Sequence, residues 1–432
     1  MMWSSGRAAP PALIVTLMLS FGALIVRSDV AKTESRVCLA GVANYTLNTA
    51  IGLCSQAVLQ TLRVGASGTV GYVTTATTPQ TTVLNLLPTF CDRRVAYPYL
   101  QPYLAVVGAG TDTTVANMLA SATIRANFIN ALVAFVKSYP NCVGIFIDFS
   151  GLTVSQAAGY SNFMAQLFTA AGAASLSLAT SLPWDSLRFS DIYYNPTLPN
   201  LPFNVLRTYD DMYDTLTSTV HPNSPLFAMN APFNDMSKTI YQNLFRWVIK
   251  GFSPGNIILG IPMYARSYTV SMAAQFGSSG TMRTTLATYC QALLFSTRNG
   301  VQVTTAGESI SSSNTLAYVF NTFAGVDAKL NFAKSNNLGG VALFSLSTSG
   351  GQNAELLRYV TSVLAPTPPT GYSYPVATTP TCGVTITFPT TVPLTTTAQP
   401  TTTVAGGTTT AAVTTTLAGA TTAAGGATTA AG

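Results

Sequence analysis

The stretch Asn141–Leu152 reads NCVGIFIDFSGL, an apolar run that contains a single carboxylate, Asp148. Side chains alternate between the two faces of a strand, so Phe146, Asp148 and Ser150 are expected to point together to one side. The other face carries Ile145, Ile147 and Phe149. The stretch therefore predicts a buried strand with one wholly apolar face and one face that ends in an acid and a hydroxyl group.

Seven further β-rich runs accompany this strand, whose own core is Gly144–Phe149. They are Val37–Val42, Thr69–Thr74, Tyr103–Val107, Ser175–Ala179, Asn204–Thr208, Ile257–Ile261 and Gly340–Leu346. Amphipathic helical patterns lie between several of them, at Ile124–Tyr139, Ser155–Ala170, Ser237–Lys250 and Val326–Asn336. Eight strands alternating with helices predict an α/β fold, a (β/α)8 TIM barrel over residues 35–365.

Two details of this fold stay open in the sequence. The loop-rich stretch 272–315 is expected to be an insertion that forms a small α+β subdomain. A doubly wound open sheet is the alternative to the barrel. It is less favoured because no G-x-G-x-x-G motif opens a helix after the first strand.

Charge is scarce in this chain. Of 432 residues, 8% are charged, with 20 Lys and Arg against 14 Asp and Glu, whereas 48% are hydrophobic. A sizeable core is therefore available, and the net charge of +6 reflects few acids rather than a basic patch. The lack of a Lys/Arg run disfavours nucleic-acid binding. The single histidine, His221, excludes a multi-histidine metal site, and no cofactor is expected.

The N-terminus has the pattern of a secretory signal peptide over residues 1–28. Arg7 precedes the apolar stretch Pro11–Val26, and Arg27 follows it. A signal anchor is the alternative, but 16 residues are few for a bilayer span of about 20. The 6 cysteines indicate up to three disulfides in a secreted chain. We therefore expect a secreted, extracellular protein with no membrane association after signal cleavage; the sequence does not indicate an oligomeric state.

The C-terminal region predicts a low-complexity tail over residues 366–432. No charged residue follows Arg358, and from Pro366 the sequence is mainly Thr, Ala, Gly and Pro. Such a composition cannot form a packed core, and outside the cell it is typical of an extended, O-glycosylated stalk. An unglycosylated flexible tail is the alternative. One N-glycosylation sequon is present, at Asn44-Tyr45-Thr46.

Four blocks, in order along the chain, resemble segments of the glycoside hydrolase family 18 chitinases. NCVGIFIDFSGL is similar to the fourth-strand signature D-G-x-D-x-D-x-E, and TYDDMYD (208–214) with HPNSPLF (221–227) resembles the sixth-strand M-x-Y-D and the segment after it. GNIILGIPMYARSYTV (255–270) and AKLNFAKSNNLGGVALFSLS (328–347) resemble the blocks around the last strands. The resemblance spans about residues 36–364. It implies a TIM barrel whose partners are chitin or N-acetylglucosamine (GlcNAc) oligosaccharides.

The acids of the fourth-strand signature are largely replaced. Aligned on Gly144, they fall on Val143, Phe146, Asp148 and Ser150. In this family a glutamic acid protonates the glycosidic oxygen, while the substrate's acetamide attacks and an aspartate orients it. Ser150 stands at the glutamate position, and a hydroxyl has no proton to donate near neutral pH.

Replacement of this acid from elsewhere in the chain is not expected. The three glutamates, Glu34, Glu308 and Glu355, do not end predicted strands, where a barrel keeps its catalytic side chains. The resemblance therefore implies a protein of the chitinase family with no catalytic residue, in which only Asp148 survives at the orienting position.

Six residues at retained positions are the candidate ligand-binding residues: Asp148, Tyr209, Asp210, Tyr264, Arg266 and Phe344. The resemblance assigns Tyr209 and Asp210 to contacts with the N-acetyl group, and Tyr264 and Arg266 to the cleft wall. Phe344 stands where a tryptophan normally floors the central subsite, so stacking is expected to weaken. The third-strand S-x-G-G pattern survives only as Val107-Gly108-Ala109-Gly110.

Each of these residues also has a purely structural interpretation. Asp148 would then be hydrogen-bonded to Tyr209 or Ser150. Tyr264 and Phe344 would pack at the barrel mouth, and Arg266 would pair with Asp210 or Asp148. Arg207 replaces a methionine that the family packs inside the barrel, and its expected partner is Asp148.

The resemblance also places a disulfide between Cys38 and Cys54. For Cys91, Cys142, Cys290 and Cys382 three pairings are open, of which Cys91 with Cys142 and Cys290 with Cys382 is one.

Three functions follow as hypotheses. The leading one is a secreted chitinase-like protein that binds chitin or GlcNAc-containing glycans without hydrolysis. The first alternative is a structural extracellular matrix or scaffold protein with no sugar binding. The second is a weakly active chitinase-type glycoside hydrolase with displaced catalysis, which requires a carboxyl of raised pKa near the barrel mouth.

Overall fold

The computed structural model describes residues 34–41, 49–75, 78–210, 213, 216–346, 355–375 and 382. The predicted signal peptide, the sequon at Asn44 and the predicted tail beyond residue 375, apart from Cys382, lie outside the described residues. Within the described part, no single helix is long and apolar enough to cross a membrane. One pair, Thr113–Ala120 and Ala122–Lys137, passes that test only jointly and is bent by 109°.

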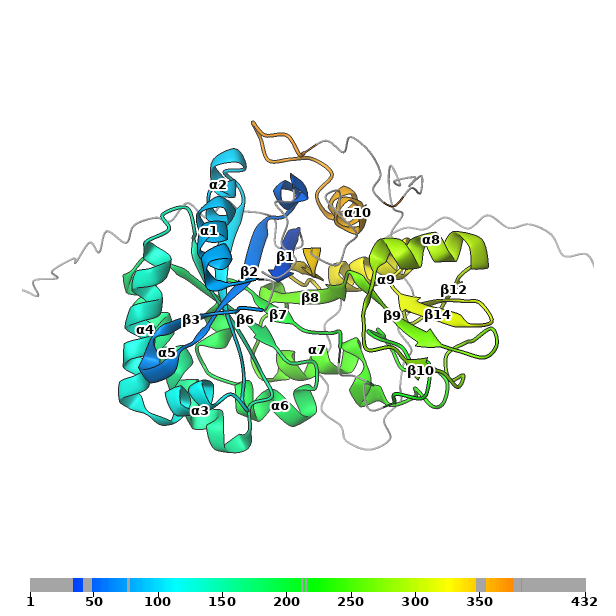
Figure 1. Cartoon of the computed structure of the whole chain (residues 1–432), viewed down its shortest axis with the longest axis horizontal. Coiled ribbons are helices and arrows are strands. Elements are labelled where there is room, and N and C mark those ends of the chain that lie inside the picture. The colour runs from blue at the N-terminus through cyan, green and yellow to red at the C-terminus, as the bar shows by residue number, and fades with distance from the viewer. Residues whose placement is uncertain are drawn as a thin grey trace, which may run out of the picture. The chain divides into compact units, whose positions relative to one another are not determined.

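Eight parallel strands close into a barrel, as the sequence predicts (Figure 1). They are β1 (Ser35–Gly41), β2 (Gln56–Val64), β4 (Gln101–Ala109), β5 (Gly144–Ser150), β6 (Ser177–Leu182), β7 (Asn204–Leu206), β8 (Ile257–Pro262) and β15 (Gly340–Phe344). β1 pairs in parallel with both β2 and β15, which closes the sheet. The doubly wound open sheet is therefore wrong.

The second strand of the barrel differs from the predicted one. The predicted strand Thr69–Thr74 corresponds to β3 (Val70–Tyr72), which only pairs antiparallel with β2 outside the barrel. The barrel strand is β2, which the sequence analysis missed because Gln60, Thr61 and Arg63 interrupt its apolar run. Its pairing with β4 shifts register between Gln60 and Leu62, as at a β-bulge.

Helices cover the outside of the barrel. They are α1 (Gln80–Cys91), α2 (Arg93–Ala96), α3 (Thr113–Ala120), α4 (Ala122–Lys137), α5 (Ala157–Ala173), α6 (Ser186–Tyr193), α7 (Ile240–Ile249), α9 (Phe323–Ser335) and α10 (Glu355–Leu364). The four predicted helical segments are found as α4, α5, α7 and α9, with ends shifted by a few residues. In α4, the Ser121 hydroxyl caps the first turn by accepting from the Ile124 amide at 3.3 Å.

Two apolar cores lie on either side of the barrel wall, and they confirm the predicted faces of β5. Ile145, Ile147 and Phe149 belong to the large core between the strands and the helices. Phe146 belongs to the smaller core inside the barrel, where its ring stacks on Phe203 with 6.2 Å between centroids. The period of two along β5 therefore fixes which side chains reach the barrel interior.

The insertion is larger than the predicted stretch 272–315. It is an antiparallel sheet with one helix, α8 (Tyr289–Asn299). Its strands are β9 (Tyr264–Thr269), β10 (Thr281–Met282), β11 (Ala287–Thr288), β12 (Gln302–Val303), β13 (Ser309–Ser312) and β14 (Leu316–Phe320). β9 begins two residues after β8 ends at Pro262, so the chain passes from the barrel into the insertion without a loop that composition would reveal.

The six cysteines form three disulfides, Cys38–Cys54, Cys91–Cys142 and Cys290–Cys382. The first is the pair that the resemblance implies, and the other two are one of the three open pairings. Glu355 lies next to Cys290 and Cys382, but the disulfide occupies both sulfurs, so this cluster offers no thiolate to a metal.

The segment after α10 packs on the barrel at the end where β1 begins. The Tyr374 hydroxyl accepts from the Arg36 guanidinium at 3.2 Å, and the Tyr372 ring lies edge-on to Tyr99 with 5.5 Å between centroids. We call residues 366–375 with Cys382 the C-terminal clasp. Residues just beyond the predicted boundary after residue 365 therefore contact the barrel.

Candidate functional site

A hollow of about 310 Å³ lies at the end of the barrel where the parallel strands finish. Its lining residues are Gly41, Gln60, Val73, Val107, Gly108, Asp148, Ser150 and Arg207. Most of them belong to the second halves of β1, β2, β4 and β5, while Val73 and Arg207 directly follow β3 and β7. This is the face of a TIM barrel where binding and catalytic groups gather. We call this hollow the mouth pocket.

Asp148 is the carboxylate of the mouth pocket, and it is 8% exposed. Its Oδ2 accepts from Gln60 Nε2 at 2.6 Å, and its Oδ1 accepts from the Ser181 hydroxyl at 2.6 Å. These partners differ from Tyr209 and Ser150, which the structural interpretation of the sequence proposed. β6 pairs directly with β5, whereas β2 lies on the other side of β5 beyond β4, so Ser181 and Gln60 reach the carboxylate from opposite sides.

Arg207 pairs with Asp148, as the sequence analysis expected. Its Nη1 lies 3.5 Å from Asp148 Oδ1, and its side chain is 25% exposed. The residue is fixed at the end of β7, where its amide donates to the Leu182 carbonyl at 2.9 Å. The mouth pocket therefore holds one negative and one positive charge in contact, and the two formal charges cancel.

The three other signature positions carry no carboxylate. Ser150 is exposed and lines the mouth pocket. Phe146 is fully buried inside the barrel, and Val143 packs against the same inner core. The ring of Phe146 thus occupies the position at which the signature has a second carboxylate beside Asp148.

The aromatic candidates pack on one another. Tyr209 stacks on Phe344 with 5.0 Å between centroids and 5° between planes, and Tyr264 lies edge-on to Phe344 at 6.4 Å. Tyr209 is 2% exposed and Tyr264 is 0% exposed, whereas Phe344 is half-buried. Burial raises the pKa of both tyrosine hydroxyls well above the ordinary value. Of these three rings, Phe344 is the one that keeps surface for a ligand.

Asp210 and Arg266 form a second polar group, built around Asn223. Arg266 Nη2 lies 3.3 Å from Asp210 Oδ1, so Arg266 pairs with Asp210 and not with Asp148. The Tyr264 hydroxyl also donates to Asp210. Arg266 Nε donates to Asn223 Oδ1 at 2.8 Å, and Asn223 Nδ2 lies 3.3 Å from the Tyr264 oxygen. The structure thus brings Tyr264, Arg266 and Asp210 together, and the contact of Arg266 with Asp210 is one of the two pairings that the purely structural interpretation proposed.

Glu308 and Lys329 support this second group from the insertion and from α9. Glu308 Oε2 accepts from the backbone amide of Asn223 at 2.7 Å, and Lys329 Nζ lies 3.0 Å from Glu308 Oε1. Lys329 also donates to Asn321 Oδ1 at 2.5 Å. Both charged side chains are at most 1% exposed. Sequence reasoning missed this pair, together with Gln60, Ser181 and Asn223, because the partners lie far apart along the chain.

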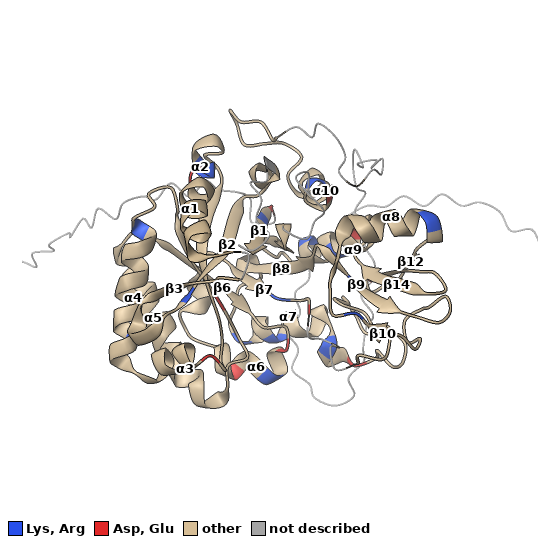
Figure 2. Cartoon of the chain, in the orientation of Figure 1, with Lys and Arg blue, Asp and Glu red and all other residues tan. Residues whose placement is uncertain are grey.

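Charged residues are thinly spread over the structure (Figure 2). Glu308 lies in the buried pair with Lys329, and Glu355 opens α10, where it accepts from the Cys382 amide at 3.2 Å. Glu34 precedes β1 at the opposite end of the barrel from the mouth pocket. None of these glutamates is among the residues that line the mouth pocket.

The family model for glycosyl hydrolases family 18 matches residues 41–348. Among solved structures, the chain is similar to the Ostrinia furnacalis Group IV chitinase in complex with allosamidin, with 20% identity and a TM-score of 0.67 over 77% of this chain and 99% of that one. The Cycas revoluta GH18 chitinase in complex with (GlcNAc)3 matches with 15% identity and a TM-score of 0.63 over 76% and 98%.

A third similar structure is the chitinase-like agglutinin from Robinia pseudoacacia. It has 16% identity and a TM-score of 0.63, and the match covers 74% of this chain and 97% of that one. At these identities the solved structures support the fold. No curated protein matches the sequence.

Proposed function

The chain belongs to glycosyl hydrolase family 18, and we propose that it is a secreted member that binds chitin or other GlcNAc-containing glycans at the mouth pocket without hydrolysing them. The observation that carries this proposal is that Ser150 and Asp148 both line the mouth pocket. The group at the position of the acid is a hydroxyl, which supplies no proton, while the orienting carboxylate remains in place.

Sugar binding is supported by the chemistry of the pocket. Its walls offer a carboxylate, a guanidinium, an amide and a hydroxyl group, which are the donors and acceptors that sugar hydroxyls and acetamides need. Its volume of about 310 Å³ lies at the lower end of the range for ligand pockets, about 300–1,000 Å³. Two similar proteins were solved with allosamidin or (GlcNAc)3, and a third is named an agglutinin.

Secretion is supported by the three disulfides, because such bonds persist mainly in oxidising compartments. This agrees with the signal peptide and the glycosylated tail expected from the sequence. In this proposal the barrel meets the glycan, and the Thr-rich tail extends from it through an extracellular matrix.

A scaffold without sugar binding is the second candidate, and one observation favours it. Tyr209 and Tyr264, which would contact the sugar, are buried against Phe344, and the Asp148 carboxylate is already engaged by three side chains. No such observation favours the third hypothesis, a weakly active hydrolase whose catalytic acid lies at another position. Burial raises the pKa of Asp327, but this carboxyl lies in α9, where the Tyr359 hydroxyl donates to it at 2.6 Å.

Replacing Ser150 with tryptophan is expected to weaken binding of a GlcNAc trisaccharide by about tenfold or more, because the indole fills the mouth pocket. Ser150 is exposed, so the fold should tolerate the change. Val154→Trp is the matched control, because Val154 is 78% exposed four residues away and does not line the pocket. Calorimetric titration of the three full-length proteins gives the affinities.

Full-length protein is required in this experiment, because cutting after residue 365 would remove the C-terminal clasp. Wild type that binds no trisaccharide would leave the scaffold as the function. Equal affinity in Ser150→Trp and wild type would place the sugar away from the mouth pocket.

A further inference from the structure

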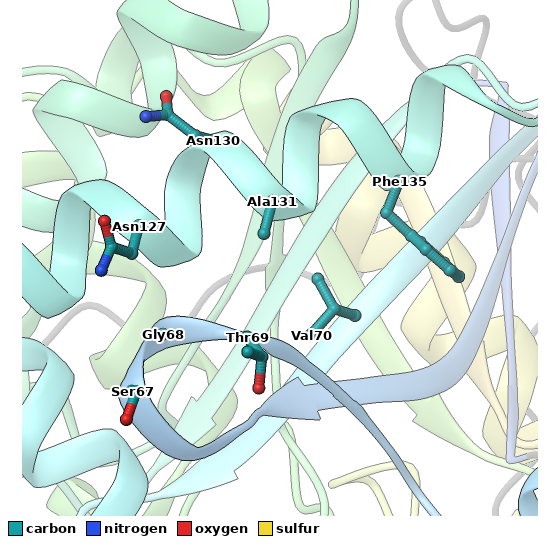
Figure 3. Close-up of a pocket in the computed structure, with 8 residues that line it drawn as sticks. All are labelled: Ser67, Gly68, Thr69, Val70, Asn127, Asn130, Ala131 and Phe135. Atoms are coloured by element: carbon teal, nitrogen blue, oxygen red, sulfur yellow. The ribbon is translucent and has the colours of Figure 1, made fainter.

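We propose that the protein carries a second glycan-binding site, a groove on the outside of the barrel that takes an extended, uncharged oligosaccharide. The groove runs between α4 and the β2–β3 hairpin, and its volume of about 590 Å³ exceeds that of the mouth pocket. Its lining residues are Ser67, Gly68, Thr69, Val70, Asn127, Asn130, Ala131 and Phe135 (Figure 3). We call it the hairpin groove. The proposal does not rest on sugar binding at the mouth pocket.

The polar groups of the hairpin groove are amides and hydroxyls only. Asn127 and Asn130 lie one turn apart on α4 and are exposed, and neither side-chain amide bonds to another described residue. Each amide group can donate and accept, so the pair can serve both the hydroxyl and the acetamide groups of a sugar. Ser67 and Thr69 add hydroxyl groups from the hairpin. The walls therefore present the hydrogen-bonding groups of a neutral polar ligand.

The apolar part of the groove includes an aromatic ring. Phe135 is half-buried and lies over Val70 at the opposite end of the groove from Asn127 (Figure 3). Tyr72 of the hairpin and Tyr139 stand edge-on to it, with 5.9 Å and 5.3 Å between centroids. Pyranose rings present apolar C–H faces as well as hydroxyls, so a surface with an aromatic ring at one end and amides toward the other suits a sugar chain better than it suits a purely apolar helix.

The groove is formed before any ligand arrives. Gly68 seats the hairpin directly on α4, since a Cβ atom there would lie 2.4 Å from the Ile124 carbonyl oxygen. The hairpin tip is closed by the bond from the Gly65 amide to the Thr69 carbonyl at 2.8 Å. Walls that are already ordered reduce the entropy that binding must overcome.

The absence of charge decides among ligand classes. None of the eight lining residues is charged, which disfavours phosphates, nucleic acids and acidic glycans, because these need Lys or Arg nearby. The groove lies on the surface between a helix and a hairpin rather than inside the fold, so it fits a section of a long chain. A neutral polysaccharide strand meets both conditions.

The test uses full-length protein with the Ser150→Trp change throughout, so that the mouth pocket is blocked. In this background, a GlcNAc hexasaccharide is expected to slow hydrogen exchange in residues 64–72 and 124–137. Asn127→Ala with Asn130→Ala should weaken hexasaccharide binding by about tenfold, the loss expected for two hydrogen bonds. Ala131→Arg, which fills the groove from the same helix, should remove the protection altogether.

Asn162→Ala is the matched control, because Asn162 is an exposed asparagine in the middle of α5, away from the groove. It should bind like the parent protein. The proposal is overturned if the hexasaccharide protects neither segment, if the double alanine variant binds as tightly as the control, or if only an acidic oligosaccharide binds. If the proposal for the mouth pocket is wrong while this one holds, Ser150→Trp will leave trisaccharide binding unchanged.

Discussion

Replacing Lys329 with methionine is expected to lower the free energy of unfolding by about 3–5 kcal/mol. Lys329 and Glu308 are buried together at 3.0 Å, and removal of the ammonium group leaves the carboxylate without a counter-charge inside the protein. Burial lowers the pKa of Lys329, whereas the Glu308 carboxylate acts in the opposite direction and so favours the charged form of this lysine. Denaturant unfolding of the full-length variant measures the loss.

Two further variants make this result specific. Lys334→Met changes the same residue type on the same helix, where the ammonium group contacts only the Val363 carbonyl at 3.2 Å among the described residues, and should cost about 1 kcal/mol or less. Glu308→Gln combined with Lys329→Met removes both charges and should recover much of the stability. Equal losses for Lys329→Met and Lys334→Met would contradict the interpretation of the buried pair.

Replacing Ser150 with glutamic acid is expected to raise the hydrolysis rate of a GlcNAc hexasaccharide by about 10²–10⁴-fold over wild type. The change restores a proton donor at an exposed position of the mouth pocket, beside the retained Asp148. The gain should lie toward the lower end of this range, because Phe146 still occupies the place of the neighbouring carboxylate. Product release is followed by chromatography of the reaction mixture.

Ser150→Gln is the matched control for this experiment, since its side chain has nearly the size of glutamic acid but no transferable proton. It should hydrolyse no faster than wild type. If wild type already releases products as fast as Ser150→Glu, the acid comes from another residue and the proposed loss of catalysis is wrong.

Much of the fold could be predicted because alternation and burial leave direct traces in the sequence. The period of two in β5 gave the correct faces, and the strand-helix alternation gave the closed barrel. The sequence did not predict β2 as a strand, because Gln60, which donates to Asp148, interrupts its apolar pattern. A residue that serves a polar site inside a barrel therefore weakens the very signal by which a strand is found.

The site was predictable in two respects: alternation along β5 puts Asp148 and Ser150 on one face, and a charge inside the barrel needs a partner. Arg207 needed a carboxylate, and Asp148 supplies it at 3.5 Å. The partners Gln60 and Ser181 depend on strand register across the barrel, and the pair of Glu308 with Lys329 depends on how the insertion folds back on α9. The contacts of the C-terminal clasp could not be predicted for another reason. Tyr372 and Tyr374 lie in a stretch whose composition resembles that of the tail.

One measurement tests the central claim, binding at the barrel without cleavage, most directly. Wild-type full-length protein is titrated calorimetrically with the GlcNAc hexasaccharide, and the sugar is then recovered and analysed by mass spectrometry after prolonged incubation. We predict saturable binding and recovery of the intact hexasaccharide. Recovery of shorter oligosaccharides, or the absence of any saturable binding, would contradict the claim.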